Sequence, residues 1–183
     1  MSDNIRQLAR SAVQARRENR LAEAKRDLVE AVGMCREQSL SLELALVLRE
    51  LGEVERGLRN LDGARDCYEE AVVLLRNNRG EPLRLAHTIR HLGDVYYDAG
   101  HAELAEPCYE ESLHLYGEQR EAPPLDVANE IRSLAVLKYD AGDKERATLL
   151  WQEAHDLYAT LGIEEGVNES SRRLAHLRTL PQP

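Results

Sequence analysis

The stretch LGDVYYDAGHAELAEPCYEES, from Leu92 to Ser112, decides the fold because the chain repeats it. Related copies are LGEVERGLRNLDGARDCYEEA at Leu51–Ala71, LAVLKYDAGDKERATLLWQEA at Leu134–Ala154 and the more divergent SAVQARRENRLAEAKRDLVEA at Ser11–Ala31. The spacing of apolar residues in each copy indicates a helix, a short turn and a second helix. Self-similarity with a period of about 40 residues is typical of a solenoid, in which stacked repeats bury their apolar faces against one another.

Small residues recur at fixed positions in the four copies. The first helix carries Ala12, Gly52, Gly93 or Ala135, and the second helix, twelve residues later, carries Ala24, Ala64, Ala105 or Ala147. Four positions after each of these alanines, on the same helical face, comes a large apolar residue, which is Leu28, Tyr68, Tyr109 or Trp151. Because small side chains let two helices approach closely, this spacing predicts antiparallel helix pairs packed around the large residues.

The best copy resembles the tetratricopeptide repeat at Leu92-Gly93, Tyr96, Gly100, Ala105, Tyr109 and Ser112. The units are lengthened to about 40–42 residues from the usual 34, and are similar in this to the repeats of kinesin light chain. HEAT and armadillo repeats also have this length, but the constant spacing of small residues in the four copies favours the tetratricopeptide interpretation. The resemblance implies a protein-binding or peptide-binding module whose opening helices line a concave groove.

The resemblance also implies an all-α, right-handed α-solenoid forming one superhelical domain over residues 1–180. We expect four repeats at about 3–38, 41–79, 82–120 and 124–161, then a capping helix at about 164–180 that covers the apolar end of the stack, and a tail at 181–183. Ser39 or Ser41 is expected to cap the first helix of the second repeat. Gly100 and Gly142 are expected to end opening helices in the left-handed conformation.

Composition excludes several functional classes. The net charge of −9 argues against general nucleic-acid binding. No run approaches about 18 uncharged apolar residues, and the first residues lack the pattern of a secretory signal, so we expect a cytoplasmic protein that does not enter a membrane. Cys35, Cys67 and Cys108 form no metal-like pair and are expected to be packing residues.

The sequence carries no enzyme motif. It lacks a glycine-rich phosphate loop, a GxSxG elbow and an HExxH helix. His87 and His91, four residues apart, could supply two metal ligands, but no third ligand accompanies them. We therefore expect a protein without catalytic residues, metal or cofactor.

One position that recurs on the opening helices, the first helix of each repeat, suggests a ligand. Arg49, Arg90, Arg132 and Arg172 recur at intervals of 41, 42 and 40 residues, and we call them the arginine column. Residues at neighbouring positions of the same helices join the column to form the candidate ligand-binding set, which is Arg49, Arg56, His87, Arg90, Asp94, Tyr97, Asn129, Arg132, Tyr139 and Arg172. Arginines bind carboxylates through paired hydrogen bonds, which predicts a partner protein or peptide with acidic residues or a C-terminal carboxylate.

Three alternatives stand beside this prediction. The column can be solvated or paired internally, because Glu53 follows Arg49 by four residues, Asp94 follows Arg90 likewise, and Glu169 is placed to reach Arg132. The chain can instead be a self-assembling scaffold, for example a homodimer formed through the N-terminal repeat. A third reading is a bacterial regulatory sensor of a small anionic ligand or a signalling peptide.

Overall fold

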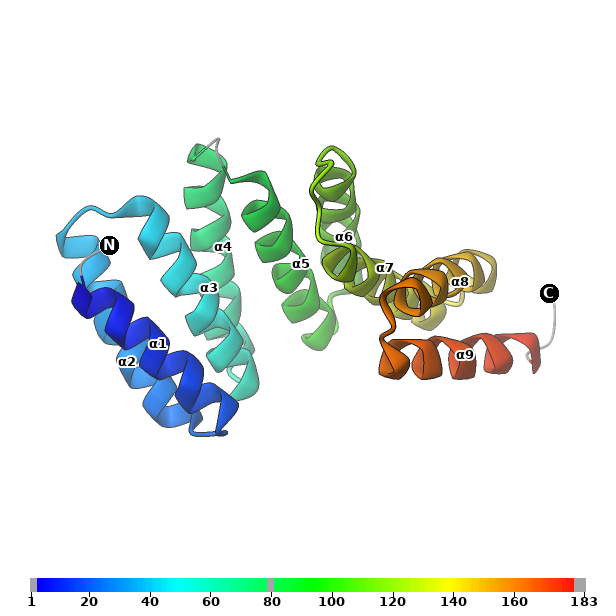
Figure 1. Ribbon diagram of the computed structural model, residues 1–183, viewed down its shortest axis with the longest axis horizontal. Helices are drawn as coiled ribbons and strands as arrows, with labels where there is room; N and C mark the ends of the chain where they lie inside the picture. The colour runs from blue at the N-terminus through cyan, green and yellow to red at the C-terminus, as the bar shows by residue number, and fades with distance from the viewer. Residues whose placement is uncertain (1–2, 79–80, 180–183) are drawn as a thin grey trace.

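The computed structural model describes residues 3–78 and 81–179, and within them the chain forms nine α-helices and no strand (Figure 1). The helices are α1 Asp3–Arg17, α2 Leu21–Glu37, α3 Ser41–Gly57, α4 Leu61–Asn77, α5 Pro82–Asp98, α6 Ala102–Gly117, α7 Pro124–Asp140, α8 Lys144–Leu161 and α9 Glu164–Thr179. Four antiparallel pairs and a final single helix follow one another, which confirms the predicted helical solenoid with a capping helix. The expected ends at Arg79 and Leu180, and the tail at 181–183, lie outside the described residues.

The small residues act as the repeat pattern predicted. A methyl group on Gly52 of α3 would lie 2.8 Å from the ring of Tyr68 on α4, and one on Gly93 of α5 would lie 2.8 Å from the ring of Tyr109 on α6. Both tyrosines are buried, as are Leu28 and Trp151. A glycine facing a tyrosine therefore sets the close approach of the two helices in the second and third repeats.

Left-handed residues end the opening helices. Gly100 and Gly142 have φ angles of 83° and 82°, which confirms the predicted turns, while Asn19 and Arg59 adopt the same conformation in the first two repeats. The prediction that Ser39 or Ser41 caps α3 is wrong. The N-cap is Leu40 and no side chain caps it, because Ser39 adopts the left-handed conformation just after α2, with φ 53°, and Ser41 is already the first residue of α3.

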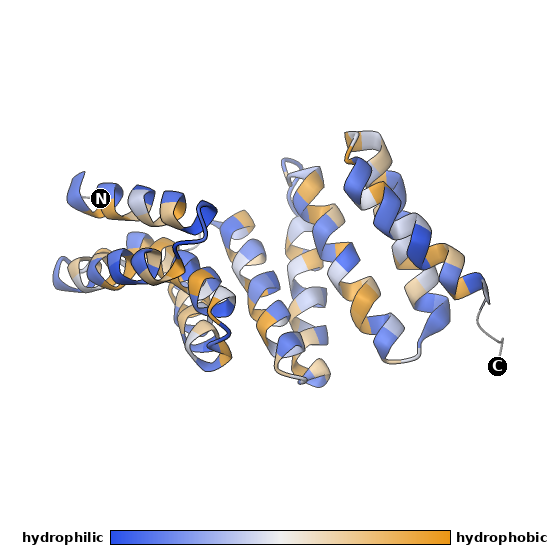
Figure 2. Cartoon of the chain, turned by 90° about the horizontal axis from the view of Figure 1, so that it is seen from below, coloured by the Kyte–Doolittle hydropathy of each residue, from blue (hydrophilic) through white to orange (hydrophobic). Residues whose placement is uncertain are grey.

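The apolar core runs along the array instead of gathering at one centre. Figure 2 shows apolar residues on every helix, between polar ones. At the C-terminal end, Leu174 and Leu177 of α9 pack against Trp151 of α8 and Ala135 of α7. The final helix thus covers the last repeat. Among the helices of residues 3–78 and 81–179, none has the length and hydrophobicity that a membrane span requires.

Candidate binding face on the opening helices

The predicted ligand-binding residues lie on the first helix of three successive repeats and on α9. Helices α1, α3, α5 and α7 are the opening helices, and we call the surface that they present the opening-helix face. The residues are distributed as Arg49 and Arg56 on α3, His87, Arg90, Asp94 and Tyr97 on α5, Asn129, Arg132 and Tyr139 on α7, and Arg172 on α9. Their partners decide which of them is available to a ligand.

Asp94 is the centre of a buried charge cluster. It is 8% exposed and its Oδ2 accepts from Arg90 and from Arg56, each at 3.2 Å. The hydroxyl of Tyr109 donates to Oδ1 at 3.0 Å. Burial alone would raise the pKa of Asp94, but His91, whose Nδ1 lies 3.5 Å from Oδ2, and the nearby Arg90 and Arg56 charges hold it below its usual value. Asp94 is therefore ionised and occupied by internal donors.

Arg56 is committed to two acids. Besides Asp94 it bonds Asp98 through Nε at 2.7 Å. Burial works against its charge, but the hydrogen bond to Asp98 and the charge of Asp94 outweigh burial and raise the pKa of Arg56. The side chain remains 30% exposed, so its charge reaches the surface already balanced.

The two histidines are hydrogen-bond acceptors for the column. Arg49 approaches His87 Nδ1 at 3.3 Å and Arg90 approaches His91 Nε2 at 2.9 Å. A guanidinium can only donate, so both ring nitrogens accept. Burial, together with the charges of Arg49 and Arg90, lowers the pKa of His87 to about 3, which keeps that ring neutral.

The histidines do not form a recognisable metal site. Their rings pack edge to face, 4.5 Å apart. The second ring nitrogen of His91 lies 2.9 Å from Glu53, the acid expected to pair with Arg49. Arg49 pairs with Glu50 instead, at 2.5 Å. Across residues 3–78 and 81–179 no group of three His, Cys, Asp or Glu side chains is placed to hold a metal ion.

The remaining predicted residues each meet a different partner. Arg132 forms two bonds to Glu169, and Asn129 accepts from the Tyr158 hydroxyl at 2.8 Å. Further contacts join Tyr97 to Asp140, Tyr139 to His176 and Arg173, and Arg172 to the Asn168 carbonyl. The structure therefore brings together Arg49 with His87 and Arg56 with Arg90 and Asp94, and leaves the other predicted residues separate. The internal acids Glu50, Asp94 and Glu169 offset the charge of three column arginines.

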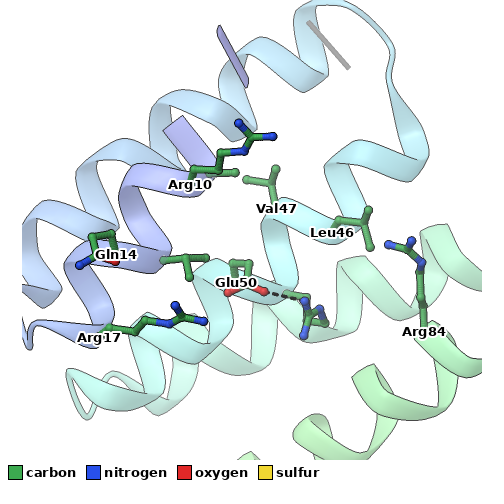
Figure 3. A pocket seen from close by; sticks show the side chains of 10 residues that line it. Arg10, Gln14, Arg17, Leu46, Val47, Glu50 and Arg84 are labelled. Atoms are coloured by element: carbon green, nitrogen blue, oxygen red, sulfur yellow. Dashed lines mark hydrogen bonds and ion pairs between the residues drawn. The ribbon is translucent and has the colours of Figure 1, made fainter. Parts of the chain in front are cut away.

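A hollow of about 410 Å³ opens where α1, α3 and α5 converge (Figure 3). Its apolar lining comes from Ala9, Val13, Leu46 and Val47. Its charged lining comes from Arg10, Arg17, Arg49, Arg84 and a single acid, Glu50. We call this hollow the N-terminal pocket. It combines a small apolar surface with an excess of positive charge.

The positive charge of the N-terminal pocket is incompletely balanced. Within the described residues, Arg10 and Arg17 have no ion-pair partner. Arg84 reaches Glu81 at 2.5 Å, outside the hollow, and Glu50 already holds Arg49 while lying 3.8 Å from Arg16. Figure 3 shows Glu50 between the arginines of the different helices. This part of the opening-helix face therefore carries positive charge that its internal acids do not fully balance.

Sequence reasoning missed Arg10 and Arg84. Both lie outside the rows that repeat in every unit, so the repeat alignment gave them no weight. A signal existed on α1, where Arg10, Val13 and Arg17 fall on one helical face by their spacing of three and four residues. Arg84 joins them only through the angle between α3 and α5, which the sequence does not specify.

Comparisons with known proteins agree with this architecture. A family model described as tetratricopeptide repeat matches residues 43–118. The crystal structure of BtubC (BKLC) from P. vanneervenii superposes with a TM-score of 0.76 at 23% identity, over 82% of this chain and 61% of that one. Kinesin light chain TPR-like repeats from Podosopora anserina superpose with a TM-score of 0.72 at 14% identity, over 97% of each chain. A comparison with curated proteins gave no match.

Proposed function

Because a tetratricopeptide-repeat family model matches residues 43–118 and the chain folds as such an array, we propose that it binds a segment of a partner protein on its opening-helix face. Repeats of this family generally mediate interactions between proteins, and solenoids offer extended concave surfaces for the purpose. The proposed role is non-catalytic and uses no cofactor. The partner segment carries acidic side chains or a C-terminal carboxylate.

The N-terminal pocket is the observation that carries this proposal. Four arginines face one acid there, and two of the four, Arg10 and Arg17, lack an internal ion pair within the described residues. A carboxylate placed among them gains charge-assisted hydrogen bonds. The apolar lining from Val13 and Leu46 takes an aliphatic side chain next to that carboxylate. We therefore infer a bound segment with an acidic residue beside an aliphatic one.

The predicted ligand-binding residues then fall into two groups, according to whether a ligand can reach their side chains. Arg90 has a side chain only 12% exposed and is held by Asp94, so it positions its neighbours more than it meets a ligand. Arg132, although paired with Glu169, keeps a side chain that is 40% exposed, and Arg172 and Tyr139 are also reachable. We propose that a bound segment starts in the N-terminal pocket and runs along α5 and α7 toward these three residues.

Defined peptides test the proposal without a known partner. A fluorescent library of short peptides that vary independently in acidic and aliphatic content is titrated by anisotropy against the wild type. The double variant Arg10→Ser, Arg17→Ser is then compared with Arg120→Ser, Arg178→Ser, which removes two exposed arginines elsewhere. We expect about a tenfold loss of affinity in the first variant only, corresponding to about 1.4 kcal/mol. Equal affinity in both variants, or no preference for acidic peptides, would contradict the proposal.

A small anion is the second candidate ligand, because the volume of the pocket lies in the range of small-molecule sites. Free citrate and acetylated glutamate, added as competitors in the same titration, separate this case from a peptide. If these competitors displace the peptide only at the concentrations at which a simple salt does, a protein segment is the favoured ligand. A homodimer through the first repeat stays a prediction, and light scattering across a wide range of concentrations tests it.

A further inference from the structure

Glu130 on α7 is an acid in a position that the other repeats fill with uncharged residues. It has no exposed surface. The equivalent positions hold Val47, Thr88 and Ser170, all of them also buried. An isolated ionised carboxylate in such a place carries a large desolvation penalty unless it is paired and hydrogen-bonded. The protonation state of Glu130 therefore has a structural consequence, and its contacts show what that state is.

The hydroxyl of Ser112 on α6 connects Glu130 to α5. Its Oγ lies 2.8 Å from Glu130 Oε2 and 2.9 Å from the carbonyl oxygen of Ala86. A serine hydroxyl has one proton to donate, and both a carbonyl and an ionised carboxylate can only accept. If Glu130 is ionised, the two acceptors must share the single Ser112 proton; if Glu130 holds a proton, it donates to Ser112 and Ser112 donates to Ala86, so that both contacts are full two-centre hydrogen bonds.

The surroundings of Glu130 provide little compensation for a negative charge. Its Oε1 has no hydrogen-bond partner within the described residues. The nearest cation is Arg90, whose Nε lies 3.9 Å from Oε2 and is itself without a hydrogen bond. The other two nitrogens of Arg90 are engaged with Asp94 and His91. Burial, against the opposing effects of Ser112 and Arg90, raises the pKa of Glu130 to about 8.

The other titratable groups around Glu130 do not compete in the neutral range. From α5 these are Arg90 and Asp94, which carry opposite charges. From α6 they are Cys108, whose pKa burial raises to about 11, and Tyr109 and Tyr116, whose pKa values burial also raises. On α8, Tyr158 bonds the adjacent Asn129 and burial raises its pKa too. Glu130 is the group of this set that changes charge near neutral pH.

We propose that Glu130 binds a proton in the folded protein at neutral pH and that its ionisation draws Arg90 away from Asp94. The protonation state of Glu130 then controls the contacts between the third and fourth repeats, since this side chain links α7 to α6 and α5. When Glu130 is ionised, two carboxylates compete for one guanidinium, and Asp94 keeps only Arg56 as a cationic partner. The bound proton and the exchange of partners do not rest on the proposed function; a change in peptide affinity with the Glu130 titration would rest on it.

Stability measured against pH tests the bound proton. The native state keeps the proton up to the raised pKa, while unfolded glutamate loses it near pH 4.3. The unfolded state therefore binds fewer protons, and stability falls as the pH rises from about 5 to 8. In Glu130→Gln the amide donates to Ser112 as the neutral acid does, and this slope disappears. Glu153→Gln, an exposed glutamate on α8, is the matched control.

The expected result is a folding equilibrium constant that falls by up to about tenfold per pH unit in the wild type and in Glu153→Gln, relative to Glu130→Gln. Parallel pH profiles for all three proteins would overturn the proposal. If Glu130→Gln does not fold, the carbon-13 shift of the wild-type Glu130 carboxyl group gives the same answer. A titration midpoint below about pH 5 would show an ordinary ionised glutamate.

The exchange of partners has its own readout. The Nε–H resonance of Arg90 should shift with the Glu130 midpoint in the wild type and stay constant in Glu130→Gln. A resonance that does not move while Glu130 titrates would overturn the exchange. Peptide affinity at about pH 6 and pH 9 is recorded separately. Absence of peptide binding at both pH values contradicts the proposed function and leaves the titration result standing.

Discussion

Arg132 of α7 and Glu169 of α9 form a two-point ion pair, with Nε and one terminal nitrogen of the guanidinium donating to the two carboxylate oxygens at 2.6 and 2.8 Å. The arginine is 40% exposed and the glutamate 23% exposed. The hydrogen bonds to Glu169, more than the opposing effect of burial, raise the pKa of Arg132. This pair connects the last repeat to the helix that covers it, and it occupies one member of the arginine column.

Replacing Glu169 with Gln should loosen the covering helix slightly. The pair is partly exposed and screened by water, so we expect a loss of about 0.5–1 kcal/mol in the free energy of unfolding. Urea denaturation measures it, and Glu165→Gln, an exposed change on the same helix, is the control. The difference should shrink in about 1 M salt, where charges are screened over about 3 Å. A difference that is independent of salt would point to lost packing instead of lost charge.

Two glycines in helix interiors should respond to alanine with opposite signs. Gly33 of α2 has open space around a Cβ position, whereas Gly52 of α3 faces the Tyr68 ring at 2.8 Å. Alanine favours a helix over glycine by about 0.8–1.0 kcal/mol, so Gly33→Ala should stabilise the protein. Gly52→Ala should destabilise it by about 1–3 kcal/mol, because the added methyl group overpacks the helix pair. Thermal and urea unfolding check both, and equal signs would contradict the role assigned to Gly52.

The contrast between these glycines also shows how far the sequence could predict the fold. Gly52 and Tyr68 are 16 residues apart within one repeat, and the same spacing recurs for Gly93 and Tyr109. Such contacts depend only on the geometry of a single helix pair, so a repeated pattern is enough to identify them. The alternating helices and the covering helix could be predicted for the same reason.

The candidate site was less predictable because its contacts cross between repeats. Arg56 bonds Asp94 and Asp98, which are 38 and 42 residues away, and no local spacing indicates that choice. Arg49 turns to Glu50 and leaves Glu53 to His91, although a spacing of four residues favoured the other pairing. Charge partners of this kind depend on the angle between neighbouring repeats, and the same angle creates the N-terminal pocket.

Neutralising Asp94 should destabilise the protein, because Arg56 and Arg90 lose their shared carboxylate partner. In Asp94→Asn, Arg56 and Arg90 keep their charges beside a neutral amide in a buried place, and we expect a loss of about 3 kcal/mol at pH 7. Because its pKa is depressed in the folded protein, Asp94 contributes stability above the unfolded pKa of about 3.9 that is lost as the pH falls. Unfolding free energies at neutral and acidic pH measure this effect.

The pH dependence of stability distinguishes the loss of the Asp94 charge from a general effect of mutation. The gap between Asp94→Asn and the wild type should narrow below about pH 4, where the wild-type carboxylate also loses its charge. Asp62→Asn makes the same change in an exposed ion pair, where Asp62 is 85% exposed beside Arg65, and should leave stability nearly unchanged. A gap for Asp94→Asn that stays constant from neutral to acidic pH would mean that packing, and not charge, is responsible.

Glu50 gives the sharpest distinction between a binding pocket and a merely solvated group of arginines. Among the described residues that line the N-terminal pocket it is the one acid, and it holds Arg49 at 2.5 Å. A carboxylate from a ligand must compete with it for the same guanidinium. Glu50→Gln therefore should strengthen the binding of acidic peptides by about fivefold, or about 1 kcal/mol, while the loss of Arg10 and Arg17 weakens it.

Opposite signs from one pocket cannot arise from a general loss of stability. A destabilised protein would bind less well in both variants, whereas the charge argument requires Glu50→Gln to bind more tightly despite losing an internal ion pair. Anisotropy titrations with the acidic peptides measure both changes, with Glu153→Gln as an exposed control of equal charge change. If Glu50→Gln raises affinity no more than Glu153→Gln does, the gain reflects net charge alone and the pocket is not the place where the ligand binds.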